Sequence, residues 1–330
     1  MWKLKNIAPL PCAAVALLFT ATLAVAQTAA NYPNKVVRVI VPYSPGGGTS
    51  AVMHIFADRL TRDMGHNFIV DNKPGGNTVI GSEAMARSAP DGHTLLLVTN
   101  THVITPWFQP NLPYDTLRDF IGVSTMVRND HMLATHPSFP AHTLKELIAY
   151  ARKNGDKINA AVTGLGTVNH LGTVLFMQAT GTKFTIVPYK GGGTAITDML
   201  SGAVQISINT VTTFAPHIRT GKLRGIAISG DKRNPVVADV PTFTEGGMKG
   251  FIAANWYALL APSATPRDIL QKLNEKVAQA QASPDVVALL AKQGVEVFPG
   301  NLAQTEAMIR SDLERIGKVI KENNIKAEAE

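Results

Sequence analysis

The stretch Val36–Ser50, which reads VVRVIVPYSPGGGTS, decides the fold, and a helical pattern over residues 51–64 follows it. The β-branched run at its start predicts a buried strand, and the apolar residues after it recur at helical spacing. Glycines lack a Cβ atom, so backbone N–H groups of the loop can approach a ligand, and the positive end of the helix dipole favours an anion there. The stretch therefore predicts an anion site. The alternative is that the three glycines only permit a tight turn.

Two further glycine turns repeat this arrangement. Residues 186–194 read IVPYKGGGT and lead into a helical pattern, and residues 163–167 read TGLGT before another helix. Loops of this kind in both halves of the chain, facing each other across a cleft, would form a clamp for an anion.

The chain length and the order of the elements predict an α/β protein with two lobes. A chain of 330 residues exceeds one ordinary hydrophobic core, and its strands and helices alternate, which favours mostly parallel sheets. We expect a strand over residues 121–127 to leave the first lobe and residues 251–260 to return to it, with a hinge at the two crossings. Lobe 1 is expected to comprise residues 27–128 and 252–330, and lobe 2 residues 129–251.

Two local predictions accompany this division. Thr143 and Glu146 have the spacing of a capping box at the start of a helix. Residues 106–114, which are rich in proline, are expected to form an irregular connection.

Residues 1–26 have the features of an export signal. Lys3 and Lys5 precede an apolar segment over residues 13–24, and small residues at positions 24–26 suit cleavage after Ala26. We therefore expect a periplasmic protein; the alternative, a retained membrane anchor, would need about 20 apolar residues. The only cysteine, Cys12, lies inside this segment, so the mature chain is expected to have no disulfide and no thiol chemistry.

The charge pattern favours a small anion over a nucleic acid as the partner. The net charge of +7 includes Lys3 and Lys5, whose removal leaves +5. No basic run with interleaved aromatic residues is present, which argues against nucleic-acid binding. A mildly positive protein attracts anionic solutes.

The strongest enzymatic alternative is an NAD-dependent oxidoreductase. Gly46, Gly48 and Ala51 match the Gly-x-Gly-x-x-Ala spacing, and Asp71 follows the next strand. Against it, Pro45 disturbs a regular dinucleotide turn, and the export signal lacks the twin-arginine pattern that carries folded, cofactor-loaded proteins. No P-loop, nucleophile elbow or zinc-protease motif occurs. The chain is therefore expected to be no enzyme and to hold no cofactor and no metal.

Isolated histidines and aromatic residues leave alternatives open. His102 follows a buried strand and is either an ordinary loop residue or part of a pocket. His131, His136 and His142 do not share a helical face, so they are interpreted as scattered surface or loop histidines. The aromatic residues near the predicted crossings either pack in the core or line the cleft; they are Trp107, Phe108, Trp256 and Tyr257.

Many short motifs in the same order resemble the periplasmic solute-binding proteins of tripartite tricarboxylate transporters, the Bug (Bordetella uptake gene) family. The resemblance covers essentially the whole mature chain. The motifs are Tyr32-Pro33, Val39–Thr49, Ala89–Leu96, Leu112–Asp115, His170-Leu171, Val187–Gly192, Gly221–Arg224, Asp239–Thr242 and Trp256-Tyr257.

The resemblance implies a Venus flytrap of the periplasmic binding protein type (type II), in which two α/β lobes close on a carboxylate without catalysis. It further implies a monomer that delivers its ligand to membrane permease subunits; reporting the ligand to a sensor kinase is the alternative. Carried over by motif, the ligand-binding residues are Tyr43, Pro45, Gly47, Gly48, Thr49 and Thr101 in lobe 1 and Thr163, Thr167, His170, Tyr189 and Asn209 in lobe 2.

The chain departs from the family pattern beside the expected pocket. Ser50 and Asn209 stand where the family often has aspartate, and Val162 replaces a frequent serine. Without these carboxylates the pocket is less able to balance an ammonium group taken out of water. We therefore expect a ligand without an amine: a di- or tricarboxylate, or an aromatic carboxylate.

Overall fold

The computed structural model describes residues 30–189, 192–230, 232–251 and 254–325. The predicted export signal lies outside these residues, and so do positions 190 and 191 of the second glycine loop. Among the described residues, no helix is both long enough and apolar enough to cross a membrane.

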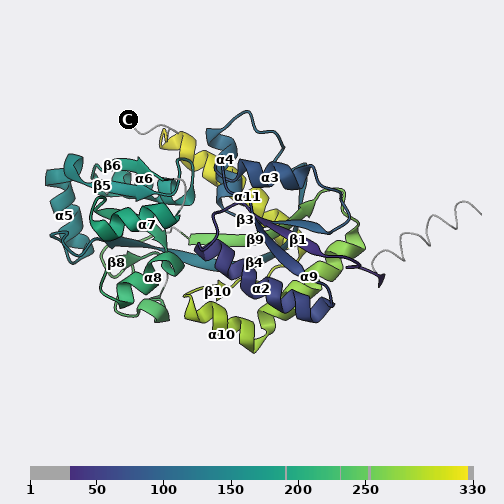
Figure 1. Ribbon diagram of the computed structural model, residues 1–330. Helices are drawn as coiled ribbons and strands as arrows, with labels where there is room; N and C mark the ends of the chain where they lie inside the picture. The colour runs from purple at the N-terminus through teal and green to yellow at the C-terminus, as the bar shows by residue number, and fades with distance from the viewer. Residues whose placement is uncertain (1–29, 190–191, 231, 252–253, 326–330) are drawn as a thin grey trace, which may run out of the picture.

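The elements form two groups, which we call lobe 1 and lobe 2 and which Figure 1 shows side by side. Lobe 1 contains β1 (Val37–Val41), α2 (Gly48–Met64), β2 (Phe68–Asn72), α3 (Val79–Ala86), β3 (Thr94–Thr99), α4 (Thr101–Phe108), β9 (Ala254–Pro262), α9 (Arg267–Ala282), α10 (Pro284–Lys292), β10 (Glu296–Val297) and α11 (Leu302–Glu322). Lobe 2 contains α5 (Leu144–Asn154), η1 (Gly155–Lys157), β5 (Asn159–Val162), α6 (Val168–Thr180), β6 (Thr185–Pro188), α7 (Gly192–Ser201), β7 (Ile206–Thr210), α8 (Val211–Arg219), β8 (Arg224–Ile228) and η2 (Pro235–Val237).

One long strand, β4 (Phe120–Thr135), belongs to both lobes. It pairs with β9 from Phe120 to Asp130 and with β7 from His131 to Thr135. The strand expected over residues 121–127 therefore continues without a break into lobe 2. The exact lobe boundaries given above stay a prediction.

The strand order is β2-β1-β3-β9-β4-β7-β5-β6, with β8 and β10 also paired to β4. The prediction of mostly parallel sheets is correct for β1, β2 and β3 and for β5, β6 and β7. It is wrong for β4, β8, β9 and β10, whose pairings are antiparallel. The chain leaves lobe 1 along β4 and returns along β9 in the opposite direction, so these two strands cannot run parallel.

The lobe 1 sheet is buried on both faces, as expected of parallel strands. Val39 and Val41 pack with α2, α9 and α10, whereas Ile40 between them packs with α3, α4 and α11. The second cluster also contains Val168 and Leu171 from α6 of lobe 2. The two lobes are therefore in apolar contact.

Helix α4 differs from the sequence prediction, which places Pro106 at the start of an irregular connection. In the structure Pro106 lies inside this helix. The following residue, Trp107, donates from Nε1 to the carbonyl of Leu313 at 3.1 Å and packs on Gly317 of α11. Packing on α11 thus stabilises the helix despite the hydrogen bond that proline cannot make.

The capping prediction for α5 is correct in its main feature. Thr143 Oγ1 accepts a hydrogen bond from the Glu146 amide at 3.2 Å. The Glu146 carboxylate accepts from the His142 amide at 2.8 Å, one residue before the cap residue expected for a capping box.

Because α4 packs closely on α11, adding one methyl group at Gly317 should destabilise the protein. A Cβ atom at Gly317 would overlap the indole ring of Trp107, so Gly317→Ala should lower the free energy of unfolding by about 1–3 kcal/mol, although alanine favours helix. Urea unfolding followed by circular dichroism measures this change. Gly193→Ala in α7 is the control, because its Cβ would meet no atom within 4 Å. Equal stability of the two variants would contradict the packing described.

Candidate ligand-binding cleft

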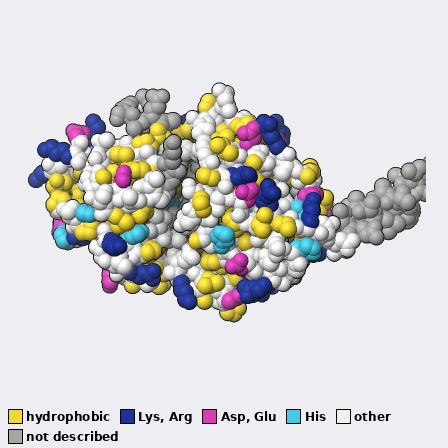
Figure 2. All heavy atoms as spheres, viewed as in Figure 1, with side chains coloured by type: hydrophobic (Ala, Val, Ile, Leu, Met, Phe, Trp, Pro, Cys, Tyr) yellow, Lys and Arg dark blue, Asp and Glu magenta, His cyan; other side chains and the backbone are white. Residues whose placement is uncertain are grey.

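The carboxyl ends of the parallel strands of both lobes meet at the middle of β4. Thr99, at the end of β3, pairs with Tyr257 of β9, and Thr210, at the end of β7, pairs with His131 of β4. Ligands of open α/β sheets bind at such carboxyl ends. On the face seen in Figure 2, uncharged atoms mostly border the groove between the lobes, and charged side chains gather farther out.

Helix N-termini converge on the same boundary without the usual groups to satisfy them. The N-caps of α2, α3, α4 and α8 are Gly47, Thr78, Asn100 and Thr210; none makes a side-chain capping bond, and none of the four helices has an acidic residue in its first turn. In contrast, α5 and α11 have a capping side chain, and α9 and α10 have an aspartate in the first turn. The start of α6, which also faces the boundary, is capped by Thr167. The amides at the start of α3 bond the carbonyls of Gly75 and Gly76, and the Thr101 amide of α4 bonds Oγ1 of Thr99. The positive N-termini of α2 and α8 are therefore the ones best placed to receive an anion.

Two of these N-termini touch across the lobes. A Cβ atom at Gly48 of α2 would lie 2.9 Å from Cγ2 of Thr212 and 3.9 Å from Oγ1 of Thr210, both at the start of α8. Two positive dipole ends at this separation repel each other, and an anion held beside them would remove that repulsion.

The structure brings the predicted lobe 1 residues together at the ends of β1 and β3. The Tyr43 hydroxyl lies 2.6 Å from Oγ1 of Thr99, and this same oxygen accepts from the Thr101 amide at 3.2 Å. Thr49 Oγ1 donates to the Tyr257 hydroxyl at 3.4 Å. The remaining predicted residues of lobe 1 lie between β1 and α2. Pro45 is exposed in the loop, Gly47 is the N-cap of α2, and Gly48 is its first residue.

In lobe 2, two predicted residues hold the glycine turn together. Thr167 caps α6, accepting from the His170 amide at 3.3 Å and donating to the Gly164 carbonyl at 2.7 Å. The His170 ring accepts at Nδ1 from the Gly166 amide at 3.1 Å. Their polar groups therefore shape the turn, which begins at Thr163 directly after β5.

The remaining two predicted residues also have partners within lobe 2. Tyr189 donates its hydroxyl proton to Asp198 at 2.7 Å, and its amide bonds the Val162 carbonyl at 2.9 Å, which places it beside the turn. Asn209 Oδ1 accepts from the Thr210 amide at 2.8 Å.

The turn over residues 163–167 faces lobe 1 at a place different from Gly48. The Asn77 side chain donates to the Leu165 carbonyl, and the rings of Phe108 and His170 lie 6.0 Å apart. The two glycine turns therefore open onto the same boundary between the lobes, one against α8 and the other against α3 and α4.

The sequence did not indicate Asn129 at this boundary, and it left open whether Tyr257 packs in the core or lines the cleft. Asn129 of β4 is fully buried and donates from Nδ2 to Thr212 Oγ1 at 2.7 Å and to the Tyr257 hydroxyl at 3.5 Å. Only their position at the two predicted crossings could have indicated Asn129 and Tyr257. His102, left open between a loop and a pocket role, is buried against Tyr114 and Phe120, which is the packing of a core residue. The surface or loop interpretation is wrong for His131, which is buried in β4 because the strand is covered where it pairs with β7.

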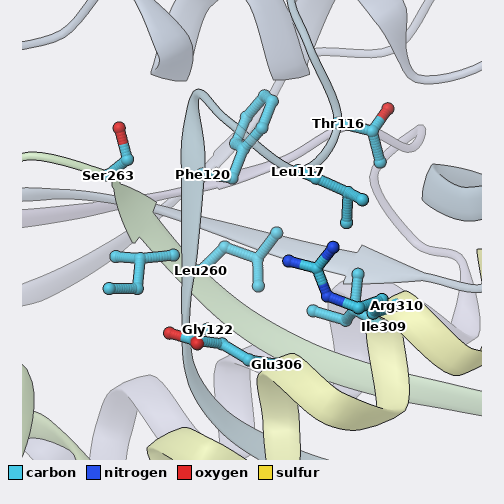
Figure 3. A pocket seen from close by; sticks show the side chains of 10 residues that line it. Thr116, Leu117, Phe120, Gly122, Leu260, Ser263, Glu306, Ile309 and Arg310 are labelled. Carbon is cyan, nitrogen blue, oxygen red and sulfur yellow. The ribbon is translucent and has the colours of Figure 1, made fainter.

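A separate hollow of about 210 Å³ lies at the far end of β4. The Arg310 guanidinium of α11 extends over it beside Leu117 and Leu260 (Figure 3). Phe120, which lines this hollow, stands nine residues along β4 from Asn129, about 30 Å at strand spacing. None of the predicted ligand-binding residues lines it.

The position of His170 predicts how stability depends on pH. Burial lowers the pKa of His170 from its ordinary value of 6.5 to about 4, so the unfolded chain binds a proton more readily than the folded chain. The stabilisation is complete above pH 6.5 and is lost as the pH falls toward 4. Urea unfolding at several pH values should show this loss, and His170→Gln should reduce it. An NMR titration midpoint near 6.5 for His170 would contradict the burial described.

Known proteins resemble this chain over most of its length. BugT of Bordetella pertussis is 34% identical over 309 residues, which cover 93% of this chain and 95% of BugT. A Rhodopseudomonas palustris protein solved with adipate superposes with a TM-score of 0.86 at 30% identity, covering 89% of this chain and 99% of that one. MatC of the same organism, solved with bound malate, superposes with a TM-score of 0.80 at 29% identity. The match covers 88% of this chain and 100% of MatC.

The family itself follows from a match over most of the sequence. Residues 52–325 match the model of the tripartite tricarboxylate transporter family receptor. Solved structures of this kind, described as periplasmic, share the fold, and the family consists of substrate-binding proteins rather than enzymes. The chain therefore belongs to the tripartite tricarboxylate transporter receptors, the Bug-type periplasmic binding proteins.

Proposed function

We propose that this protein captures a small, amine-free carboxylate between its two lobes in the periplasm and delivers it to a membrane transporter of the tripartite tricarboxylate class. The observation that carries the proposal is the close approach of two uncapped helix N-termini, α2 and α8, across the lobe boundary. The relatives solved with adipate and malate support a carboxylate as the ligand.

Lobe 1 provides the main anion contacts in this proposal. The first-turn N–H groups of α2, at Gly48 and Thr49, bind one carboxylate, and the Tyr43–Thr99–Thr101 cluster borders it. Gly47 and Pro45 hold the loop in place. Backbone donors suit this task because they need no reorganisation when the anion arrives.

Lobe 2 closes over the bound acid. The turn from Thr163 to Thr167, shaped by His170, and the start of α8 after Asn209 approach the ligand only when the lobes meet, with Tyr189 beside them. A ligand that contacts both lobes binds the closed form better and shifts the hinge equilibrium toward it. Capture then requires no chemical step.

The polar groups at the boundary favour a ligand without a positive charge. Ser50 is buried, and its hydroxyl lies 3.3 Å from Oδ1 of Asn72, so this position offers no carboxylate to an ammonium group. Asn209 is likewise neutral. A buried ammonium without a partner would cost several kcal/mol, so we expect amino acids to bind more weakly than the corresponding plain acids.

A thermal-shift and calorimetry panel tests the proposal on the mature chain, from Gln27 onward. An acid present at a hundred times its dissociation constant should stabilise the protein by about 2.7 kcal/mol. We expect this from at least one di-, tri- or aromatic carboxylate. The proposal fails if no acid in the panel binds, and its amine-free part fails if aspartate or glutamate binds more tightly than every plain acid.

Substitution of Gly48 tests whether the two lobes must approach each other at this place. Gly48→Ala adds a methyl group that would press on Thr212, so it should weaken binding roughly tenfold while leaving the unliganded protein folded. Adding Thr212→Ser removes the Cγ2 atom but keeps the hydroxyl, and should restore part of the affinity. Unchanged affinity in the single variant would contradict closure at this contact.

A further inference from the structure

Where the lobes meet, a buried acceptor without a hydrogen-bond partner lies beside a buried hydroxyl whose own proton has no assigned acceptor among the described residues. Asn129 is fully buried and Tyr257 is 1% exposed, yet both lie where the lobes meet, between Thr49 of lobe 1 and Thr212 of lobe 2. Buried polar groups are normally hydrogen-bonded, and each exception requires an explanation.

The first unsatisfied group is an acceptor. The Asn129 amide uses its nitrogen for Thr212 at 2.7 Å and Tyr257 at 3.5 Å. Its oxygen, Oδ1, has no hydrogen-bond partner among the described residues. Leaving such a buried acceptor unpaired destabilises the folded protein.

The second unsatisfied group is a donor. Both hydrogen bonds of the Tyr257 hydroxyl, from Thr49 and from Asn129, end on its oxygen. Among the described residues, no acceptor is assigned to its own proton. A free donor and a free acceptor therefore stand next to each other.

We propose that Asn129 and Tyr257 form a subsite for a hydroxyl substituent of the ligand, so that the protein selects hydroxy acids over the same acids without the hydroxyl. An alcohol group accepts the phenol proton and donates its own proton to Asn129 Oδ1, which satisfies both groups at once. A carboxylate cannot do this, because it has no proton to donate. The inference rests on the proposed function, since it concerns the same cleft.

The elements that hold these two residues fix their geometry. Asn129 lies on β4 and Tyr257 on β9, which pair antiparallel through the centre of the molecule. The Tyr257 ring is part of the core packed against α2 and α9. A site built on buried strands keeps its polar groups in position and discriminates strongly against an analogue that leaves them unpaired.

Calorimetry with two acids that differ only in one hydroxyl tests the inference. The pair is malate and succinate if a short diacid binds, or mandelate and phenylacetate if an aromatic acid binds. The wild type should bind the hydroxy acid at least about tenfold more tightly, from the cost of two unpaired buried groups. Equal affinities would overturn the inference while leaving the proposed function intact; failure of every acid in the panel would instead overturn the proposed function.

Two variants separate recognition from structural support. Tyr257→Phe and Asn129→Leu should each bring the affinity ratio close to one, mainly by weakening the hydroxy acid. Tyr32→Phe is the matched control, because the Tyr32 hydroxyl is buried and bonded to the Gly92 carbonyl at 2.7 Å, away from the cleft. Tyr32→Phe should leave the ratio of the affinities for the hydroxy acid and the plain acid unchanged.

The same variants test whether the oxygen and nitrogen of the Asn129 side-chain amide are exchanged. If the Asn129 amide were turned over, its N–H groups would face the site and would bind a carboxylate oxygen. Asn129→Leu would then weaken both acids by the same factor, and that result would overturn the inference. A ratio that Tyr257→Phe leaves unchanged would overturn it as well.

Discussion

The meeting of two helix N-termini at Gly48 and Thr212 is the constraint on which the cleft depends. Both helices begin without a capping side chain and without an acidic residue in the first turn, whereas α5, α9, α10 and α11 have one or the other. This contact brings positive N–H groups together at the lobe boundary, where neither N-cap residue makes a side-chain capping bond. The described side chains around it are mainly threonine, asparagine and tyrosine, so the proposed anion would be held there by backbone dipoles.

The sheet explains why these N-termini meet. In a parallel strand–helix unit the helix begins at the carboxyl end of its strand, and the strands of both lobes point their carboxyl ends at the middle of β4. A second network fixes α4 in place: Trp256 donates from its backbone to Asn100 at 2.8 Å and from its indole to Asp312 at 2.6 Å. The lobe 1 half of the cleft is thus supported by buried hydrogen bonds to β9 and α11, while lobe 2 contributes loops.

The parts of the fold that could be predicted from the sequence are those encoded locally. The run of β-branched residues, the glycines and the helical spacing near the N-terminus sufficed to predict β1, its loop and α2. The long-range parts could not be predicted in the same way. Whether β4 and β9 pair antiparallel depends on the path of the whole chain, and the helical state of Pro106 depends on packing against α11.

The same distinction applies to the site. The position of Thr101, directly after a buried strand, could be predicted, because ligands gather at strand ends; that Thr49 and Thr101 contact a ligand stays a prediction. Asn129 was not, because its role comes from Tyr257 and Thr212, which are distant in sequence. The ring of His170 bonds the Gly166 amide four residues earlier; nothing in the spacing alone distinguishes that structural bond from a ligand contact.

A crystal structure of the mature protein grown with a bound dicarboxylate tests the central claim most directly. The account predicts a carboxylate within hydrogen-bond distance of the Gly48 and Thr49 amides, with the start of α8 closed over it. An acid bound elsewhere, for example under Arg310 at the far end of β4, with the amides of α2 facing only solvent, would contradict the account.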